Sequence, residues 1–169
     1  IGYCLLNKGK FLPAETAYRQ AVLNSPKNLD WTAGLAQTLY NLAKYEEALA
    51  LFKDLAAEDP DEQEYWSLMV NVYLNLGDDS KAASTLEIIR RMGQASPKNL
   101  GLLGDIYLNQ QAFSLALEAY QEALKTGDGL PAETPLRTVD ILYTYGSYQL
   151  AEQLIKDVRA RYSNSLNKE

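Results

Sequence analysis

The feature that most constrains this chain is an internal repeat of about 34 residues. Alanine recurs at this spacing at positions 14, 48, 82 and 116, and again at position 151, one residue late. Three further columns share the period: Gly2, Ala36, Val70, Gly104 and Val139; Leu5, Leu39, Tyr73, Tyr107 and Leu142; Tyr18, Phe52, Leu86, Tyr120 and Ile155. Because several independent columns agree on one period, the sequence predicts a repeat architecture.

Residues 103–124 show how one repeat is built. Gly104 and Tyr107 share one face of a first helix. Ala116, Tyr120 and Ala123 share one face of a second helix, as expected for apolar residues at helical spacing. A hairpin of about thirty residues buries too little apolar surface to offset its loss of conformational entropy. Each hairpin is therefore expected to be completed by its neighbours in a stack.

Turn and cap residues divide the chain into five predicted helix pairs. The expected helices are 1–8 with 11–24, 29–42 with 45–58, 62–76 with 79–92, 97–110 with 113–126, and 132–145 with 148–162. Pro26 and Pro60 end second helices, since proline disfavours helix in the residue before it. Ser96 is a candidate N-cap with Pro97 at the first helical position, and Gly127 is a candidate C-cap. The polar tail from Ser163 is expected to fray.

These residues resemble the tetratricopeptide repeat (TPR) family, whose unit is 34 residues folded as helix–turn–helix. The resemblance covers residues 1–163 and departs from the family pattern at Asp79, which replaces an aromatic residue, and in the fifth repeat, which has a one-residue insertion. It implies an all-α fold, a right-handed α-solenoid of stacked antiparallel helix pairs. Residues 1–169 would form a single domain with repeats at about 1–28, 29–62, 63–96, 97–130 and 132–165.

Composition excludes several classes of function. With 16 basic and 22 acidic residues the net charge is −6, which disfavours a nucleic-acid partner. There is no histidine, so the common zinc sites and His-dependent nucleophiles are absent, and no metal or cofactor site is expected. No run of 18 apolar residues predicts a membrane span. Cys4 is the only cysteine and lies in a core column, which predicts a buried, inert thiol.

The resemblance implies that the first helix of each pair lines a concave groove that holds a peptide or a partner helix. The residues on this face are Asp30, Ala33, Gln37, Tyr40, Glu64, Ser67, Asn71, Leu74, Lys98, Gly101, Asp105, Leu108, Glu133, Leu136, Asp140 and Tyr143. Five carboxylates and one lysine favour a neutral to basic partner segment. The alternative is that these residues are ordinary solvated helix faces. The lysine and arginine clamp with which some family members hold an acidic C-terminus is missing.

Asparagine recurs at the predicted ends of four first helices, at Asn7, Asn41, Asn75 and Asn109. One interpretation is a ladder of amides that hydrogen-bonds a bound peptide in the groove. The other, which we favour, is that asparagine adopts the left-handed conformation at a helix end and satisfies orphan carbonyls. Among the many tyrosines, we expect Tyr3, Tyr40 and Tyr143 to be contact anchors.

The sequence thus predicts a non-enzymatic scaffold that binds a peptide or helical segment of a protein partner. Asp105 and Asp140 lie on adjacent first helices, but nothing in the sequence raises a carboxyl pKa or builds an oxyanion site. The alternatives are a structural spacer or self-assembly module that associates through uncapped ends, or the regulatory arm of an enzyme encoded elsewhere. Because the chain begins with Ile1 inside a predicted helix, we expect it to be a piece of a longer protein.

Overall fold

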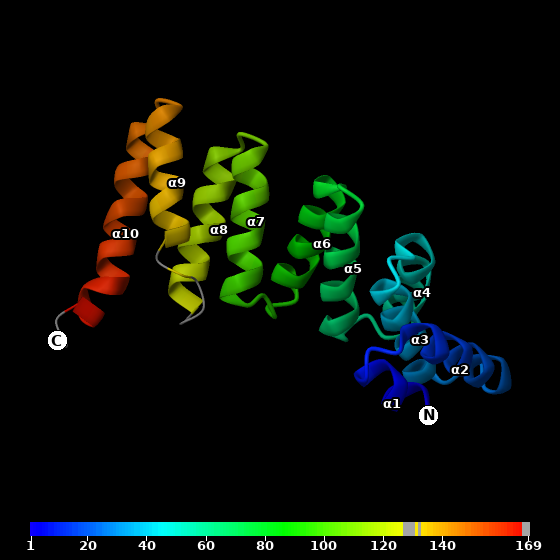
Figure 1. Cartoon of the computed structure of the whole chain (residues 1–169). Coiled ribbons are helices and arrows are strands. Elements are labelled where there is room, and N and C mark those ends of the chain that lie inside the picture. Colours follow the sequence, from blue (N-terminus) through cyan, green and yellow to red (C-terminus); the bar gives the residue numbers. More distant parts are fainter. Residues whose placement is uncertain (127–130, 132, 167–169) are drawn as a thin grey trace. The chain divides into compact units, whose positions relative to one another are not determined.

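The computed structural model describes residues 1–126, 131 and 133–166, which form ten α-helices (Figure 1). They are α1 (Gly2–Asn7), α2 (Phe11–Asn24), α3 (Leu29–Asn41), α4 (Tyr45–Glu58), α5 (Gln63–Asn75), α6 (Asp79–Arg91), α7 (Pro97–Asn109), α8 (Phe113–Thr126), α9 (Glu133–Thr144) and α10 (Tyr148–Leu166). The predicted helices match these closely, except that α10 continues through Ser163, where we expected fraying, to Leu166. Neither proline nor glycine follows Tyr162 to end the helix. Gly127 lies outside the described residues.

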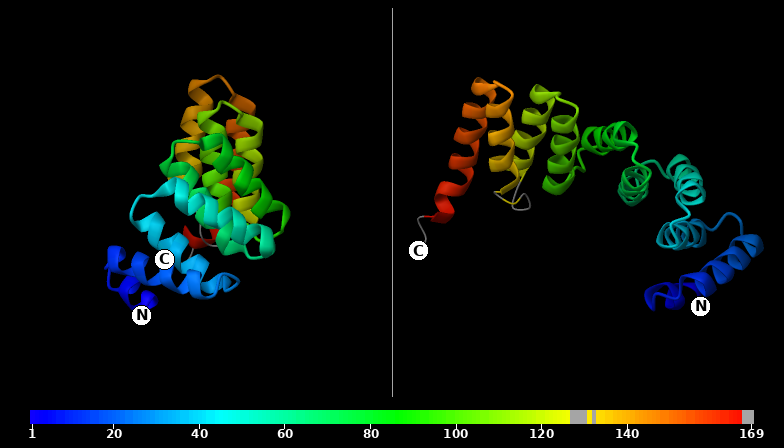
Figure 2. Two further views of the ribbon diagram at one scale, coloured as in Figure 1. Left: turned by 90° about the vertical axis from the view of Figure 1, so that its right-hand side faces the viewer. Right: turned by 45° about the horizontal axis from the view of Figure 1, so that its top comes forward.

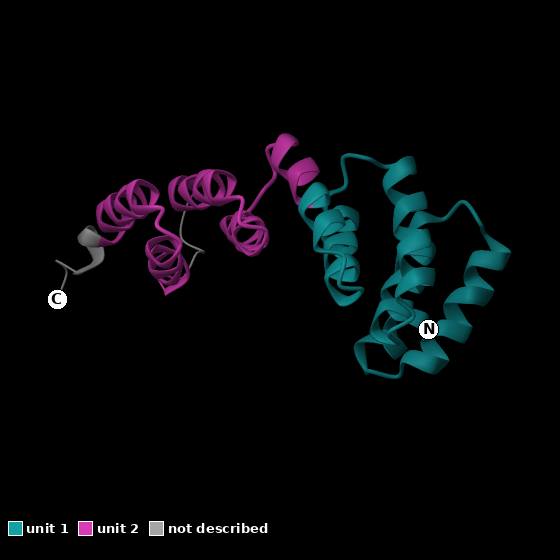
Figure 3. Cartoon of the chain, turned by 90° about the horizontal axis from the view of Figure 1, so that it is seen from above, with its two compact units in different colours: residues 1–85 teal, residues 86–169 magenta. Residues whose placement is uncertain are grey.

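The chain divides into two compact units, residues 1–85 (unit 1) and residues 86–169 (unit 2), which Figure 3 colours separately. The boundary falls inside α6. Each unit is built from helix pairs of the same repeat. The single domain and the repeat boundaries that we expected for the whole chain stay a prediction.

In unit 1, α3 packs against both α2 and α4, and α4 packs against α5, so each hairpin is covered by the next (Figure 2). The alanine column lies in the interior: Ala14, Ala48 and Ala82 are fully buried. Phe52 is also fully buried, and Leu39 is 1% exposed. The predicted core columns are therefore confirmed here, because small residues let two helices approach while large ones fill the space beside them.

In unit 2 the same columns form one apolar core shared by α7, α8, α9 and α10. Ala116, Tyr120, Leu142 and Ala151 are all fully buried. Tyr120 lies against Gly104 on α7, and a Cβ atom added to that glycine would be 2.8 Å from the tyrosine ring. The glycine in this column is thus required by a close approach.

The turn inside each pair has one residue with positive φ, and this residue also recurs with the repeat. It is Gly9, Gly77 and Gly146 in three pairs, with φ of 69°, 72° and 72°, but Ala43 and Gln111 in the other two, with φ of 56° and 59°. The left-handed residue therefore lies two positions after the helix-ending asparagine. Our expectation that the asparagines adopt this conformation was wrong, because the helix closes through the backbone of the following turn.

Replacing Ala43 with glycine is expected to stabilise unit 1 by about 0.5–1 kcal/mol. The left-handed conformation costs a residue with a Cβ atom about 1–2 kcal/mol, whereas the extra freedom of glycine in the unfolded chain costs about 0.4–1 kcal/mol. The midpoint of urea unfolding measures the difference. Ala50→Gly, at an exposed position inside α4, is the matched control and should destabilise by about 1 kcal/mol. Equal signs for the two substitutions would contradict this account.

Cys4 is exposed, which corrects the prediction of a buried thiol. The equivalent residues of later pairs are buried: Thr38 and Val72 completely, and Ile106 to 3% exposure. A later first helix has a preceding helix to pack against, as α3 has α2. Among the described residues α1 has no such neighbour, and none of its residues is buried.

Candidate functional site

The first helices of unit 1 line a cavity of about 330 Å³. Its lining residues come mainly from α1, α3 and α5, the helices that the sequence assigned to the groove. They are Tyr3, Leu6, Tyr18, Asp30, Ala33, Gly34, Gln37, Glu62, Glu64, Tyr65 and Leu68. The structure thus brings together five predicted residues, namely Tyr3, Asp30, Ala33, Gln37 and Glu64.

Three carboxylates of this cavity stand at helix N-termini for a local reason. Asp30 lies in the first turn of α3, and Glu64 lies in the first turn of α5. Glu62 is the N-cap of α5, and its side chain accepts a hydrogen bond from the backbone N–H of Glu64 at 3.2 Å. Negative charge is favourable at these positions because the helix N-terminus carries partial positive charge. Capping alone, however, does not explain why acids of two helices line one cavity.

The cavity combines negative charge with apolar and aromatic surface. Burial raises the pKa of the Tyr65 phenol, and the nearby charges of Glu62, Asp59 and Asp30 raise it further. No lysine or arginine is among the residues that line it, all of which belong to the described part of unit 1. A cationic group that entered would gain electrostatic attraction without displacing a resident cation.

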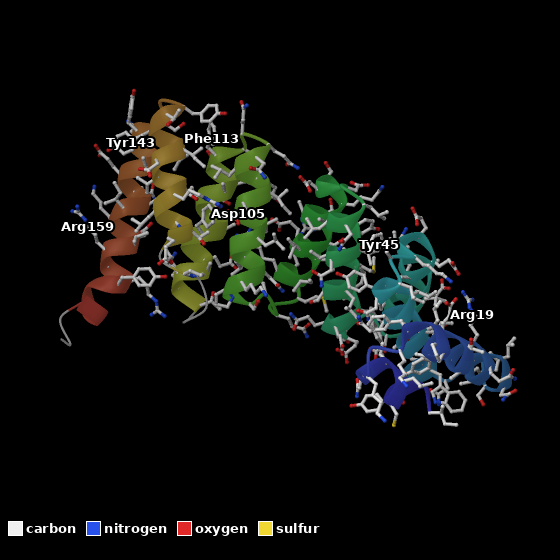
Figure 4. All side chains as sticks on the ribbon, in the orientation of Figure 1. Arg19, Tyr45, Asp105, Phe113, Tyr143 and Arg159 are labelled. Carbon is white, nitrogen blue, oxygen red and sulfur yellow. The ribbon has the colours of Figure 1, made fainter. Side chains whose placement is uncertain are left out.

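A second cluster joins the predicted residues Tyr40 and Asn75 at the turn side of the same first helices. The Asn75 amide donates to the Tyr40 hydroxyl at 3.2 Å, and its carbonyl oxygen accepts from the Tyr45 hydroxyl at 3.0 Å. Tyr45 lies at the start of α4 (Figure 4). The same Asn75 amide donates to the backbone carbonyl of Asn71, as Asn41 does to Gln37, both at 2.8 Å. These amides therefore already make hydrogen bonds within the chain.

The predicted groove residues of unit 2 are placed differently. Asp105 on α7 (Figure 4) accepts hydrogen bonds from the Tyr120 hydroxyl at 2.7 Å and from Arg137 at 3.2 Å. Burial raises the pKa of Tyr120 strongly. Asp105 is thus paired internally, which is at odds with a catalytic pair formed with Asp140. Four other predicted residues are exposed, namely Lys98, Asn109, Asp140 and Tyr143.

Gly101 is buried, which corrects its place on the open face. Glycine has no side chain to project from the helix, so the side chains around Gly101 cover its backbone. In unit 1 the predicted groove residues Ser67 and Tyr40 are half-buried, whereas Asn41, Asn71 and Asn75 are exposed.

Charged residues on or next to the second helices form ion pairs with one another and not with residues of the predicted groove. In unit 1, Lys44 donates to both carboxylate oxygens of Glu15 at 2.8 and 2.9 Å, and Arg19 joins Glu15 to Glu47. The hydrogen bond from Lys44 is the main cause that lowers the pKa of Glu15. In unit 2, Arg90 similarly joins Glu87 to Glu122. These contacts hold successive helix pairs together.

Six residues that line the cavity were not predicted as groove residues: Leu6, Tyr18, Gly34, Glu62, Tyr65 and Leu68. Tyr65 and Leu68 follow the predicted Glu64 and Ser67 by one position, because the lining face of α5 is turned toward α3. Their spacing of three keeps both residues on one helix face, but Glu64 and Ser67 have the same spacing, so the sequence does not single out Tyr65 and Leu68.

The described helices include none that is both long and apolar enough to cross a membrane. In the same part of the chain no group of three or more cysteine, aspartate or glutamate residues is arranged to hold a metal ion.

Stacked antiparallel helix pairs with a repeat of about 34 residues define the class of helical-repeat proteins. The tetratricopeptide repeat models match residues 5–72, 44–106 and 97–126. The chain therefore belongs to the tetratricopeptide repeat family.

Among curated relatives, the TPR repeat-containing protein YpiA of Bacillus subtilis is 26% identical over 121 residues, which are 72% of this chain and 28% of that protein. The human protein O-mannosyl-transferase TMTC1 is 27% identical over 157 residues, which are 93% of this chain and 17% of that protein. The chain thus spans less than a third of the length of these relatives.

Solved structures share the fold. MamA from Desulfovibrio magneticus RS-1 superposes with a TM-score of 0.75 at 17% identity, covering 97% of this chain and 92% of that chain. YrrB, described as a TPR protein with an unusual peptide-binding site, has a TM-score of 0.65 at 18% identity and covers 90% of this chain and 86% of its own. The expected fold class, an α-solenoid of antiparallel helix pairs, is confirmed.

Proposed function

We propose that this chain is a non-enzymatic protein-interaction module whose unit 1 cavity binds a neutral to basic peptide segment. The family fold indicates an interaction scaffold. The observation that carries the finer proposal is the composition of the cavity: three carboxylates, Asp30, Glu62 and Glu64, beside the rings of Tyr3 and Tyr65, with no lysine or arginine among the described lining residues.

The size of the cavity limits what it holds. About 330 Å³ is at the lower end for a ligand site, so it accommodates one or two side chains rather than a folded partner. A lysine or arginine suits it, because such a side chain presents an apolar stem to Leu6 and Leu68 and a charged head to the carboxylates. An apolar neighbour in the peptide would lie against the tyrosine rings. The peptide-binding site attributed to YrrB supports this use of the fold.

The proposal is tested with a peptide library displayed on phage and selected on the chain, followed by fluorescence anisotropy with the selected peptides. We expect enrichment of lysine and arginine next to apolar residues. The double substitution Asp30→Lys and Glu64→Lys should weaken binding by at least about tenfold, since loss of one charge-assisted contact is worth about that much.

The control makes one such reversal of charge at a place outside the cavity. Glu118→Lys lies on the exposed side of α8 in unit 2, and a variant with this change should bind the selected peptides as the unmodified chain does. Selection of acidic peptides, or equal affinity for the unmodified chain and the cavity variant, would rule out the proposed site.

A further inference from the structure

A second cavity in unit 1 lies between α2, α3 and α4, and we call it the α2–α4 cavity. Its volume is about 840 Å³, which is in the range of ligand sites. Its apolar lining comes from Val22 on α2, Leu29 on α3, and Leu51 and Leu55 on α4. It shares no lining residue with the unit 1 cavity of the proposed function. The two cavities are therefore separate sites.

The following repeat shows which side chain the α2–α4 cavity lacks. Thr32 lines this cavity, and the residue 34 positions later is Trp66. The indole N–H of Trp66 donates to the backbone carbonyl of Pro60 at 2.8 Å. Pro60 is the repeat equivalent of Pro26, another lining residue, whose carbonyl accepts no hydrogen bond from the described residues. Threonine in place of tryptophan thus leaves unused the space and the acceptor that Trp66 uses in the next helix pair.

The lining residues that α4 contributes include two acids. Asp54 and Glu58 lie one turn apart on α4, are exposed, and form no ion pair with another described residue. A helix C-terminus carries partial negative charge, so acids are unfavourable there. The last turn of α4 has no basic residue, whereas those of α6 and α8 do. Stability within the chain therefore does not account for these two acids.

Lys27 is the basic residue of the lining, and it stands in the turn between α2 and α3. It is exposed and is not paired with Asp54 or Glu58. The two carboxylates thus stay available to a cation from outside the chain.

We propose that the α2–α4 cavity is a second protein-interaction site, which takes a tryptophan side chain from a partner segment that carries lysine or arginine one helical turn away. The indole would lie beside Thr32 and donate to the Pro26 carbonyl, as Trp66 does to Pro60. The basic group would reach Asp54 and Glu58, which makes the two surfaces complementary in charge. Tryptophan suits such a site because it combines a large apolar ring with one hydrogen-bond donor. Binding here does not depend on peptide binding in the unit 1 cavity.

The probe is a synthetic alanine-rich peptide with one tryptophan and two lysines on the next helical turn. It is titrated into the isotope-labelled chain and followed by heteronuclear NMR from micromolar to millimolar concentration. We expect saturable shifts at the residues that line the α2–α4 cavity. Peptides with alanine in place of the tryptophan, or glutamate in place of the lysines, should each bind at least about tenfold more weakly.

Two variants of the chain test the two halves of the site. Thr32→Trp fills the cavity from within, as Trp66 does in the next pair, and should abolish binding, whereas Thr32→Ala keeps the space and should retain it. Glu58→Lys should weaken binding by about tenfold. This change is favourable at a helix C-terminus, so weaker binding would not reflect unfolding. Glu118→Lys is the matched control and should bind the probe as the unmodified chain does.

Circular dichroism verifies that each variant is folded. Lack of saturable shifts at millimolar peptide would overturn the proposal, as would shifts confined to the unit 1 cavity or equal binding by Glu58→Lys and the unmodified chain. The variant with Asp30→Lys and Glu64→Lys should bind this probe normally, and Thr32→Trp should bind the phage-selected peptides normally. Failure here is therefore distinct from failure of the proposed function.

Discussion

Replacing Tyr120 with alanine is expected to lower the free energy of unfolding of unit 2 by about 3–5 kcal/mol, the range for removing a buried aromatic ring. Tyr120 is fully buried, and its ring lies against Gly104. Its hydroxyl donates to Asp105 at 2.7 Å, so the substitution removes a hydrogen bond as well as packing. Guanidinium unfolding followed by circular dichroism measures the loss.

Two further variants separate these contributions. Tyr120→Phe keeps the ring and leaves Asp105 with Arg137 as its partner, so about 1 kcal/mol should be lost. Tyr145→Ala makes the same chemical change as Tyr120→Ala at a position that is 56% exposed. It removes mainly the contact with the Phe113 ring, whose centroid lies 5.3 Å from that of Tyr145. Such a contact is worth about 1 kcal/mol. If Tyr145→Ala cost as much as Tyr120→Ala, burial could not be the cause.

Replacing Gly34 with alanine is expected to destabilise unit 1 by about 2 kcal/mol, although alanine favours helix by about 1 kcal/mol. A Cβ atom at this position would lie 2.3 Å from the ring of Tyr18. The ring is 7% exposed, and its atoms come within 3.0 Å of the corresponding Cβ position of Gly2. The ring is thus in close contact with both glycines and would have to shift to admit a Cβ atom, and such overpacking costs about 1–3 kcal/mol.

Urea unfolding measures this loss of stability, and a double-mutant cycle tests whether the Tyr18 ring is its cause. With Tyr18→Leu in place the clash is relieved, so adding Gly34→Ala should cost less than about 0.5 kcal/mol or even stabilise the helix, and the two changes should not be additive. An equal loss with and without the tyrosine would show that the ring is not the obstacle.

The repeat period alone was enough to predict the helices and most of the core. Helix geometry determines which residues share a face, so a column such as Ala48, Ala82 and Ala116 can be assigned to the interior without any coordinates. The start of α7 was equally predictable: Ser96 accepts a hydrogen bond from the backbone of Asn99, because N-capping depends only on neighbours in sequence.

Only part of the cavity lining could be predicted from the sequence. Asp30 and Glu64 could be placed on the groove side, but Tyr65 and Leu68 could not, since their place depends on how far α5 is rotated about its own axis. The same holds for Asp105, whose partners Tyr120 and Arg137 come from two other helices. A helical pattern identifies a face but does not say which side chain of another helix meets it.

The sequence by itself determined the class of this protein: paired helices, the columns that hold them together, and a family in which such pairs present a surface to other proteins. These follow from period and local capping, which act between residues close along the chain. Only the tertiary structure decided which carboxylates make hydrogen bonds and ion pairs within the chain and which line a cavity. It also decided that Cys4 is exposed. Those outcomes depend on contacts between residues far apart in sequence, which no local pattern encodes.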